Sequence, residues 1–223
     1  NGVIYGCREL IDHVGQYKDL KFPAQLTDAP EMVLRGGCVG IQKMEYLPGR
    51  GVYEYPYTPE SFPWFYDKEQ WIKYLDMLVE NRMNSLYLWN GHPFASLVKL
   101  EEYPFAVEVD DETFKKNEEM FSFLTAEADK RGIFVIQMFY NILLSKPFAE
   151  HYGLKTQDRN RPITPLVSDY TRKSVAAFIE KYPNVGLLVC LGEAMDTYED
   201  DVEWFTKTII PGVKDGLKAL GRT

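Results

Sequence analysis

Short apolar runs alternate with amphipathic segments along most of the chain, and this alternation limits the fold more than any other feature of the sequence. The apolar runs begin near residues 33, 85, 133 and 185, so one repeat takes about 50 residues. Between the runs, apolar residues recur three and four positions apart, as on one face of a helix. Strands joined by helices of this length run parallel, so the sequence predicts a sheet built from βα units.

The predicted strands are rich in aliphatic and aromatic residues and cover residues 32–40, 84–90, 133–141 and 185–193. Asp67 is expected to cap the helix after the first strand, with Gln70 in the reciprocal position of a capping box. The later helices are predicted over about 111–131, 169–182 and 200–220, the last one interrupted by Pro211 and Gly212.

The chain has room for half of a closed barrel. Eight such units would need about 400 residues, and the chain has 223. We therefore predict a parallel (β/α) barrel of TIM type, of which residues 32–223 form the first four βα units. An open sheet of four or five strands is the alternative. Because a half barrel leaves two strand edges open, the remaining half is expected from the same gene product or a second chain.

The N-terminal segment has a different pattern. Residues 2–14 carry apolar side chains at helical spacing, and residues 15–31 are polar and contain Pro23 and Pro30. We interpret residues 1–31 as a helix and linker that lie outside the barrel.

Composition excludes several classes of function. The chain has 25 Lys and Arg against 33 Asp and Glu, and this net charge of −8 argues against nucleic-acid binding. No apolar stretch is long enough to span a membrane. The sequence lacks nucleotide-binding, serine-hydrolase and zincin motifs, and its three histidines are scattered, so we expect no cofactor and no metal. Aromatic residues reach 14%, which favours a ligand that stacks on rings.

Polar and aromatic side chains lie where the predicted strands end, and ligands of parallel α/β folds bind at the carboxyl ends of strands. These candidate substrate-binding residues are Arg35, Trp89, Asn90, His92, Gln137, Tyr140, Asn141 and Asp196. Hydrogen-bonding groups beside flat rings are suited to a sugar, which presents both hydroxyls and C–H faces.

Glu193 is the candidate catalytic residue. It follows the apolar run 187–191 with only Gly192 between them. Partial desolvation at such a strand end would raise the pKa of its carboxyl group and let it act as a general acid. The alternative is a surface glutamate, or one that pairs with Arg35.

The other candidates also have structural alternatives. His92 lies between Gly91 and Pro93 and could simply cap a turn, and Trp89 could belong to the core.

Gly2-Val-Ile-Tyr-Gly-Cys-Arg-Glu-Leu-Ile11 is similar to the last helix of the small α/β domain that precedes the barrel in glycoside hydrolases of family 20, the hexosaminidases, and family 67, the α-glucuronidases. Pro30-Glu-Met-Val-Leu-Arg-Gly-Gly37 resembles their first barrel strand, and residues 71–89 resemble their first helix and second strand. Gly192-Glu193 matches the place after strand four where related barrel glycosidases keep an acid/base carboxylate.

The resemblance implies a glycosidase that degrades a poly- or oligosaccharide, needs no cofactor and is secreted or periplasmic. Family 20 enzymes have an Asp-Glu pair after strand four, whereas Gly192 stands at the Asp position here. The second carboxylate would come from later strands, with Asp196 as a substitute. The alternatives are a non-catalytic carbohydrate-binding or scaffold domain, or a lyase or isomerase, which would need a phosphate or metal site.

Overall fold

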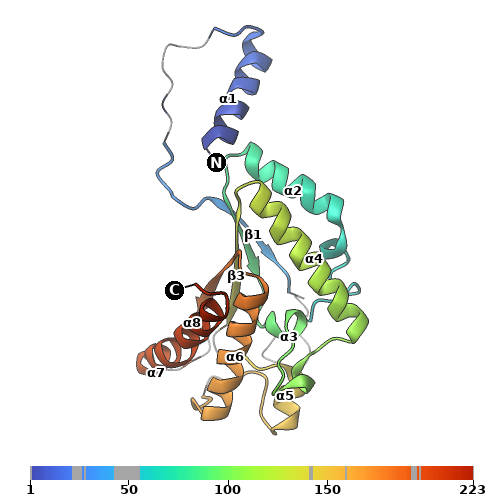
Figure 1. Ribbon diagram of the computed structural model, residues 1–223, viewed down its shortest axis with the longest axis vertical. Coiled ribbons are helices and arrows are strands. Elements are labelled where there is room, and N and C mark those ends of the chain that lie inside the picture. Colours follow the sequence, from blue (N-terminus) through green and yellow to red (C-terminus); the bar gives the residue numbers. More distant parts are fainter. Residues whose placement is uncertain are drawn as a thin grey trace.

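The computed structural model describes residues 2–21, 27, 29–42, 56–140, 143–158, 160–191, 195 and 197–222 (Figure 1). Within these residues the strands form one parallel sheet in the order β1-β2-β3-β4. The strands are β1 (Gly36–Gly40), β2 (Ser85–Trp89), β3 (Phe134–Tyr140) and β4 (Val185–Cys190). The prediction of parallel strands, adjacent in chain order, is confirmed.

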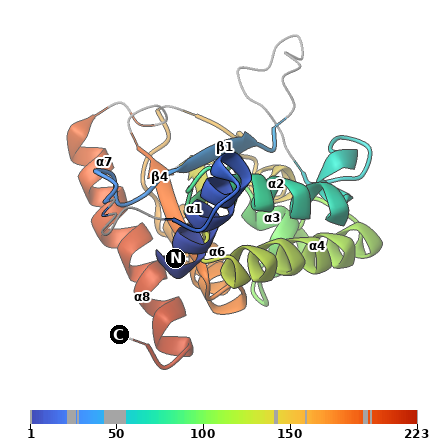
Figure 2. The same ribbon diagram turned by 90° about the horizontal axis from the view of Figure 1, so that it is seen from above.

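Helices connect the strands and lie along one side of the sheet (Figure 2). The α-helices are α1 (Gly2–Tyr17), α2 (Lys68–Glu80), α3 (Phe94–Leu97), α4 (Asp111–Lys130), α5 (Lys146–His151), α6 (Pro165–Lys181), α7 (Tyr198–Trp204) and α8 (Ile210–Ala219). The short 3₁₀-helices η1 (Pro63–Tyr66) and η2 (Pro104–Ala106) lie in the loops. A π-helical turn, η3 (Phe205–Ile209), joins α7 to α8. The predicted interruption at Pro211 and Gly212 is wrong, because both residues lie in the first turn of α8, where a proline is tolerated. Among the described residues, no helix is long and apolar enough to cross a bilayer.

Side-chain caps fix where the connecting helices begin. The Asp67 carboxylate accepts a hydrogen bond from the Gln70 N–H at the start of α2, as the sequence predicts. Asp110 and Thr164 cap α4 and α6 in the same way. Each cap satisfies a backbone donor that the first helical turn leaves unpaired.

Strand β1 begins at Gly36, four residues later than predicted. The sheet requires glycine at this position, because a Cβ on Gly36 would lie 1.8 Å from the carbonyl oxygen of Ser85. Residue 35 precedes the strand, and its carbonyl oxygen accepts hydrogen bonds from the N–H groups of Asn84 and Ser85. The apolar run before Gly36 therefore leads into the sheet without belonging to it.

Side chains alternate between the two faces of the sheet. The face toward the helices carries the core, including Leu86, Leu88, Val135 and Phe139, all of which are fully buried. The opposite face, which we call the open face, carries Trp89, Phe134, Met138, Tyr140 and Leu188. All of these are half-buried or exposed. This one-sided arrangement is what four βα units of a barrel would give, and the described strands do not close into a ring.

Helix α1 contacts the rest of the molecule through its polar side. The Tyr5 hydroxyl donates to the Met83 carbonyl at 3.1 Å, and Arg8 pairs with Glu80 at 3.3 Å. None of the helix residues is buried, and Val3 on its apolar stripe is 81% exposed. The assignment of residues 1–31 to a separate domain stays a prediction.

Candidate active site

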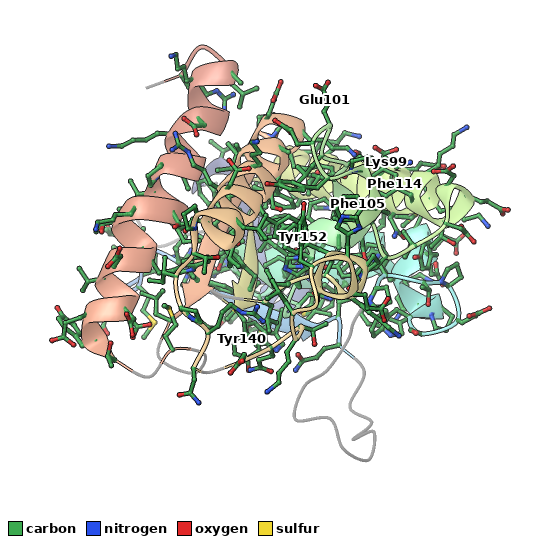
Figure 3. All side chains as sticks on the ribbon, turned by 90° about the horizontal axis from the view of Figure 1, so that it is seen from below. Lys99, Glu101, Phe105, Phe114, Tyr140 and Tyr152 are labelled. Carbon is green, nitrogen blue, oxygen red and sulfur yellow. The ribbon has the colours of Figure 1, made fainter. Side chains whose placement is uncertain are left out.

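The carboxyl ends of the four strands lie at one end of the molecule, which Figure 3 shows from below. In a parallel fold this end carries the ligand site. The predicted residues Asn141, Glu193 and Asp196 lie outside the described residues. The described part of the site consists of the ends of β2 and β3 and the turn after β2.

Trp89 and Tyr140 form an aromatic pair at this end of the open face. Their ring centroids lie 4.9 Å apart with an interplanar angle of 69°, an edge-to-face contact. The Tyr140 N–H donates to the Gly91 carbonyl at 3.1 Å, so the two strands stay paired up to these residues. Both rings are only half-buried. They provide a ring surface on which the C–H face of a sugar could stack.

Asn90 is fully buried and holds the turn after β2. Its side-chain amide donates to the Ile41 carbonyl at 2.7 Å, and its side-chain oxygen accepts from the His92 N–H at 2.9 Å. The side chain therefore joins the end of β1 to the turn that carries His92. This geometry makes Asn90 a positioning residue, whereas the sequence predicts a substrate contact.

His92 turns toward helix α6. Its Nε2 lies 2.9 Å from the Tyr170 hydroxyl, and its ring meets Phe94 edge to face. Burial lowers the pKa of His92 to about 4, so its imidazole is uncharged at neutral pH. It can donate or accept a hydrogen bond there but supplies no positive charge. The sequence does not single out Tyr170, because helical periodicity does not reveal the partner of a buried hydroxyl.

The prediction that Gln137 lines the site is wrong. Gln137 is fully buried on the helix-covered face, and its amide donates to the Leu88 carbonyl at 3.0 Å. Adjacent residues of a strand point to opposite faces. Because Met138 and Tyr140 point to the open face, Gln137 points to the helix-covered face.

The predicted position of Arg35 is also wrong. Arg35 precedes β1 and thus lies at the amino end of the sheet, the end opposite to the predicted site. Its guanidinium donates to the carbonyl oxygens of Met32 at 2.6 Å and Arg82 at 3.0 Å. These contacts fasten the entry to β1, and they leave the carboxyl end without its predicted arginine.

A groove lies away from the strand ends. A groove of about 460 Å³ opens beside the edge strand β1 and is lined by Val39, Trp64, Gln70, Trp71, Lys73, Tyr74 and Met77. Its lining is mostly apolar and comes from β1, η1 and α2. No group of three or more His, Cys, Asp or Glu side chains in the described part of the chain could hold a metal ion.

The chain resembles two solved glycoside hydrolases. A GH138 enzyme targeting pectin rhamnogalacturonan II is 82% identical over the whole chain, with a TM-score of 0.95. The chain spans 26% of that protein's length. A glycoside hydrolase family 20 beta-N-acetylglucosaminidase shares the fold with a TM-score of 0.52 at 14% identity, over 88% of this chain and 43% of that one.

The sequence matches no protein-family profile and no curated protein. The resemblance to glycoside hydrolases is thus confirmed at the level of the enzyme class. The nearly identical structure belongs to family 138, whereas the sequence motifs suggest families 20 and 67.

Proposed function

We propose that this chain is the first half of the catalytic barrel of a glycoside hydrolase, with Glu193 as its general acid. The observation that carries the proposal is the 82% identity over the whole chain to a glycoside hydrolase of family 138. Since the chain spans about a quarter of that protein, the activity belongs to a larger unit of which these residues form one part.

The described geometry supports the role of Glu193. The β4 strand pairs with β3 up to Cys190 and Tyr140, and Glu193 follows Cys190 by three residues in the sequence. A general acid must hold its proton, and a nearby positive charge would remove that proton by favouring the carboxylate. Arg35 lies at the other end of the sheet, and His92 is uncharged, so neither of these two candidate cations opposes a protonated Glu193.

We assign the substrate to the pectic polysaccharides, because the 82% identical enzyme targets pectin rhamnogalacturonan II. The ring surface of Trp89 and Tyr140 would receive the sugar next to the bond that is cleaved. A second carboxylate, from Asp196 or from later strands, should lie about 5–5.5 Å from Glu193 for retention or about 6.5–9.5 Å for inversion. A polymeric substrate of this kind fits a secreted or periplasmic enzyme.

The other half of the barrel would complete the site. The open face exposes apolar side chains, and the apolar groove beside β1 and α2 lies on the flank where a further βα unit would pack. The missing units would come from the same gene product or from a second chain.

The test is Glu193→Gln in the complete enzyme, assayed on a pectic oligosaccharide and on a nitrophenyl glycoside. Glutamine cannot protonate the leaving oxygen, so the rate on the oligosaccharide should fall about 10²–10⁴-fold. The loss should be smaller on the nitrophenyl glycoside, whose leaving group needs no protonation. Glu199→Gln, on the exposed start of α7, is the matched control and should keep full activity.

Equal activity of Glu193→Gln and the parent on the oligosaccharide would contradict the assignment. Binding of the oligosaccharide by the parent without any hydrolysis would favour the non-catalytic carbohydrate-binding alternative.

A further inference from the structure

Three aromatic rings from two different loops meet at the rim of the carboxyl end. Phe105 belongs to η2 in the loop between β2 and α4, while His151 and Tyr152 lie at the end of α5 in the loop between β3 and α6. In the view of Figure 3, Tyr152 and Phe105 lie between Tyr140 and the labelled Phe114 of α4. We call this cluster of Phe105, His151 and Tyr152 the rim platform.

The rings of the rim platform are held by contacts with one another. His151 stacks on Phe105 with centroids 4.2 Å apart and an interplanar angle of 26°. The ring centroid of Tyr152 lies 4.8 Å from that of His151 and 4.9 Å from that of Phe148. Phe148 is fully buried and stacks on Tyr170 at 4.0 Å, so the platform rests on the aromatic core.

Hydrogen bonds between backbone N–H groups and side-chain oxygens hold the segment that carries the platform. The Ser145 hydroxyl caps α5 by accepting from the Phe148 N–H, and the Glu108 carboxylate accepts from the Lys146 N–H at 2.5 Å. The Glu108 contact joins the two loops that supply the rings. A surface fixed before binding loses little conformational entropy when a ligand arrives.

The platform leaves ring surface in contact with water. Tyr152 is 39% exposed, and His151 is exposed as well. Lys146 and Glu150 on the same short helix are exposed and could hydrogen-bond to hydroxyl groups around the rings. A few rings surrounded by polar groups suit a single sugar ring. A stable protein partner would need about 800 Å² on each side, far more than these three rings offer.

We propose that the rim platform binds a sugar residue of the polysaccharide at a distance from the bond that is cleaved. This inference rests on the proposed function for its substrate class, and it adds a second binding site to it. Tyr152 would stack on the sugar, and His151 and Phe105 would hold the tyrosine ring in place. The platform would then select long substrates over short ones.

The experiment compares Tyr152→Ala with the parent in the complete protein, using pectic oligosaccharides of increasing length and a nitrophenyl monosaccharide. Loss of the ring should raise KM for the long oligosaccharides about three- to tenfold, with kcat and the nitrophenyl rate within about twofold of the parent. Tyr152→Phe keeps the ring and should keep KM. Tyr198→Ala, at a tyrosine 78% exposed on α7, is the matched control and should change nothing.

The outcomes separate this inference from the proposed function. The platform would be overturned if Tyr152→Ala had the parent's KM for oligosaccharides of every length. It would also be overturned if the variant lost as much kcat/KM on the nitrophenyl substrate as on the long oligosaccharides. If the parent hydrolyses none of these substrates, the proposed function fails, and electrophoresis through a pectin-containing gel still tests the platform. If pectin slows the migration of the parent but not of Tyr152→Ala, the platform is supported. If pectin does not slow the parent, the platform is overturned. A dimer of the parent that Tyr152→Ala dissociates would show a protein contact in place of a sugar site.

Discussion

The two faces of the sheet differ although the same strands build both. Phe139 in β3 points toward the helices and is 1% exposed, whereas Phe134 in the same strand points to the open face and is 60% exposed. The helix-covered face is completed by α2, α4, α6 and α8, which lie close to the strands in the sequence (Figure 2). The open face has no such cover among the described residues, and it carries the Trp89 and Tyr140 pair at its carboxyl end. Stability is therefore expected to depend on one face and function on the other.

The largest expected effect contrasts these two phenylalanines. Phe139→Ala removes a ring that packs edge to face on Phe94 at 4.9 Å, and it should lower the free energy of unfolding by about 3–5 kcal/mol. Phe134→Ala in the same strand should lower it by less than about 1 kcal/mol, because its ring is largely in water already. Urea denaturation of the 223-residue chain measures both values. Similar losses for the two variants would show that the open face also carries the core.

A smaller effect is expected where two helices of the covered face approach closely. A Cβ on Gly216 of α8 would lie 2.7 Å from the Ala176 carbonyl oxygen of α6. Gly216→Ala should therefore lower the free energy of unfolding by about 1–3 kcal/mol.

The matched control is Gly6→Ala in the exposed helix α1, where nothing lies within 4 Å of the added carbon. Alanine there should raise helix propensity by about 0.5–1 kcal/mol and should not destabilise the chain. Thermal denaturation should show a lower stability for Gly216→Ala and an equal or higher stability for Gly6→Ala. That result would sharpen the difference between packed and unpacked helices. A neutral Gly216→Ala would contradict the close packing of α6 and α8.

The smallest effect concerns His92, in the turn after β2. Burial lowers the pKa of His92 to about 4 in the folded chain, below its ordinary value, so the unfolded chain binds the proton more tightly. Stability from this group is complete above about pH 6.5 and is lost as the pH falls toward 4. Because His92 is partly exposed, we expect a loss of about 1–2 kcal/mol.

Denaturation midpoints between pH 4 and 7 measure this effect, and His92→Asn should flatten their pH dependence. If the denaturation midpoint of His92→Asn still falls with pH as steeply as that of the parent, other groups cause the pH dependence.

The sequence predicts the covered part of the fold well because short-range patterns determine it. Alternating segments give the parallel strands in chain order, and Asp67 marks the start of α2. The errors concern register. The sequence suggests a strand end at Arg35 because the apolar run begins before the first paired residue, Gly36. The sequence suggests that Gln137 lines the site because β3 carries apolar residues on both faces, which hides the period of two.

The sequence does not reveal which loops contact each other. Phe105 and His151 are 46 positions apart, and no local pattern shows that their rings stack. The sequence predicts that Trp89 and Tyr140 lie at strand ends, and the register of the parallel strands brings them together. The roles of Glu193, Asn141 and Asp196 stay predictions, because these residues lie outside the described part of the chain.

The most direct test of the account is a crystal structure of the complete Glu193→Gln protein with an uncleaved pectic oligosaccharide. We predict a sugar ring against Trp89 and Tyr140, with the glycosidic oxygen within about 2.6–3.2 Å of the side chain of residue 193. An oligosaccharide bound elsewhere, with the Trp89 and Tyr140 rings covered by protein side chains, would contradict the assignment of the active site to this end of the open face.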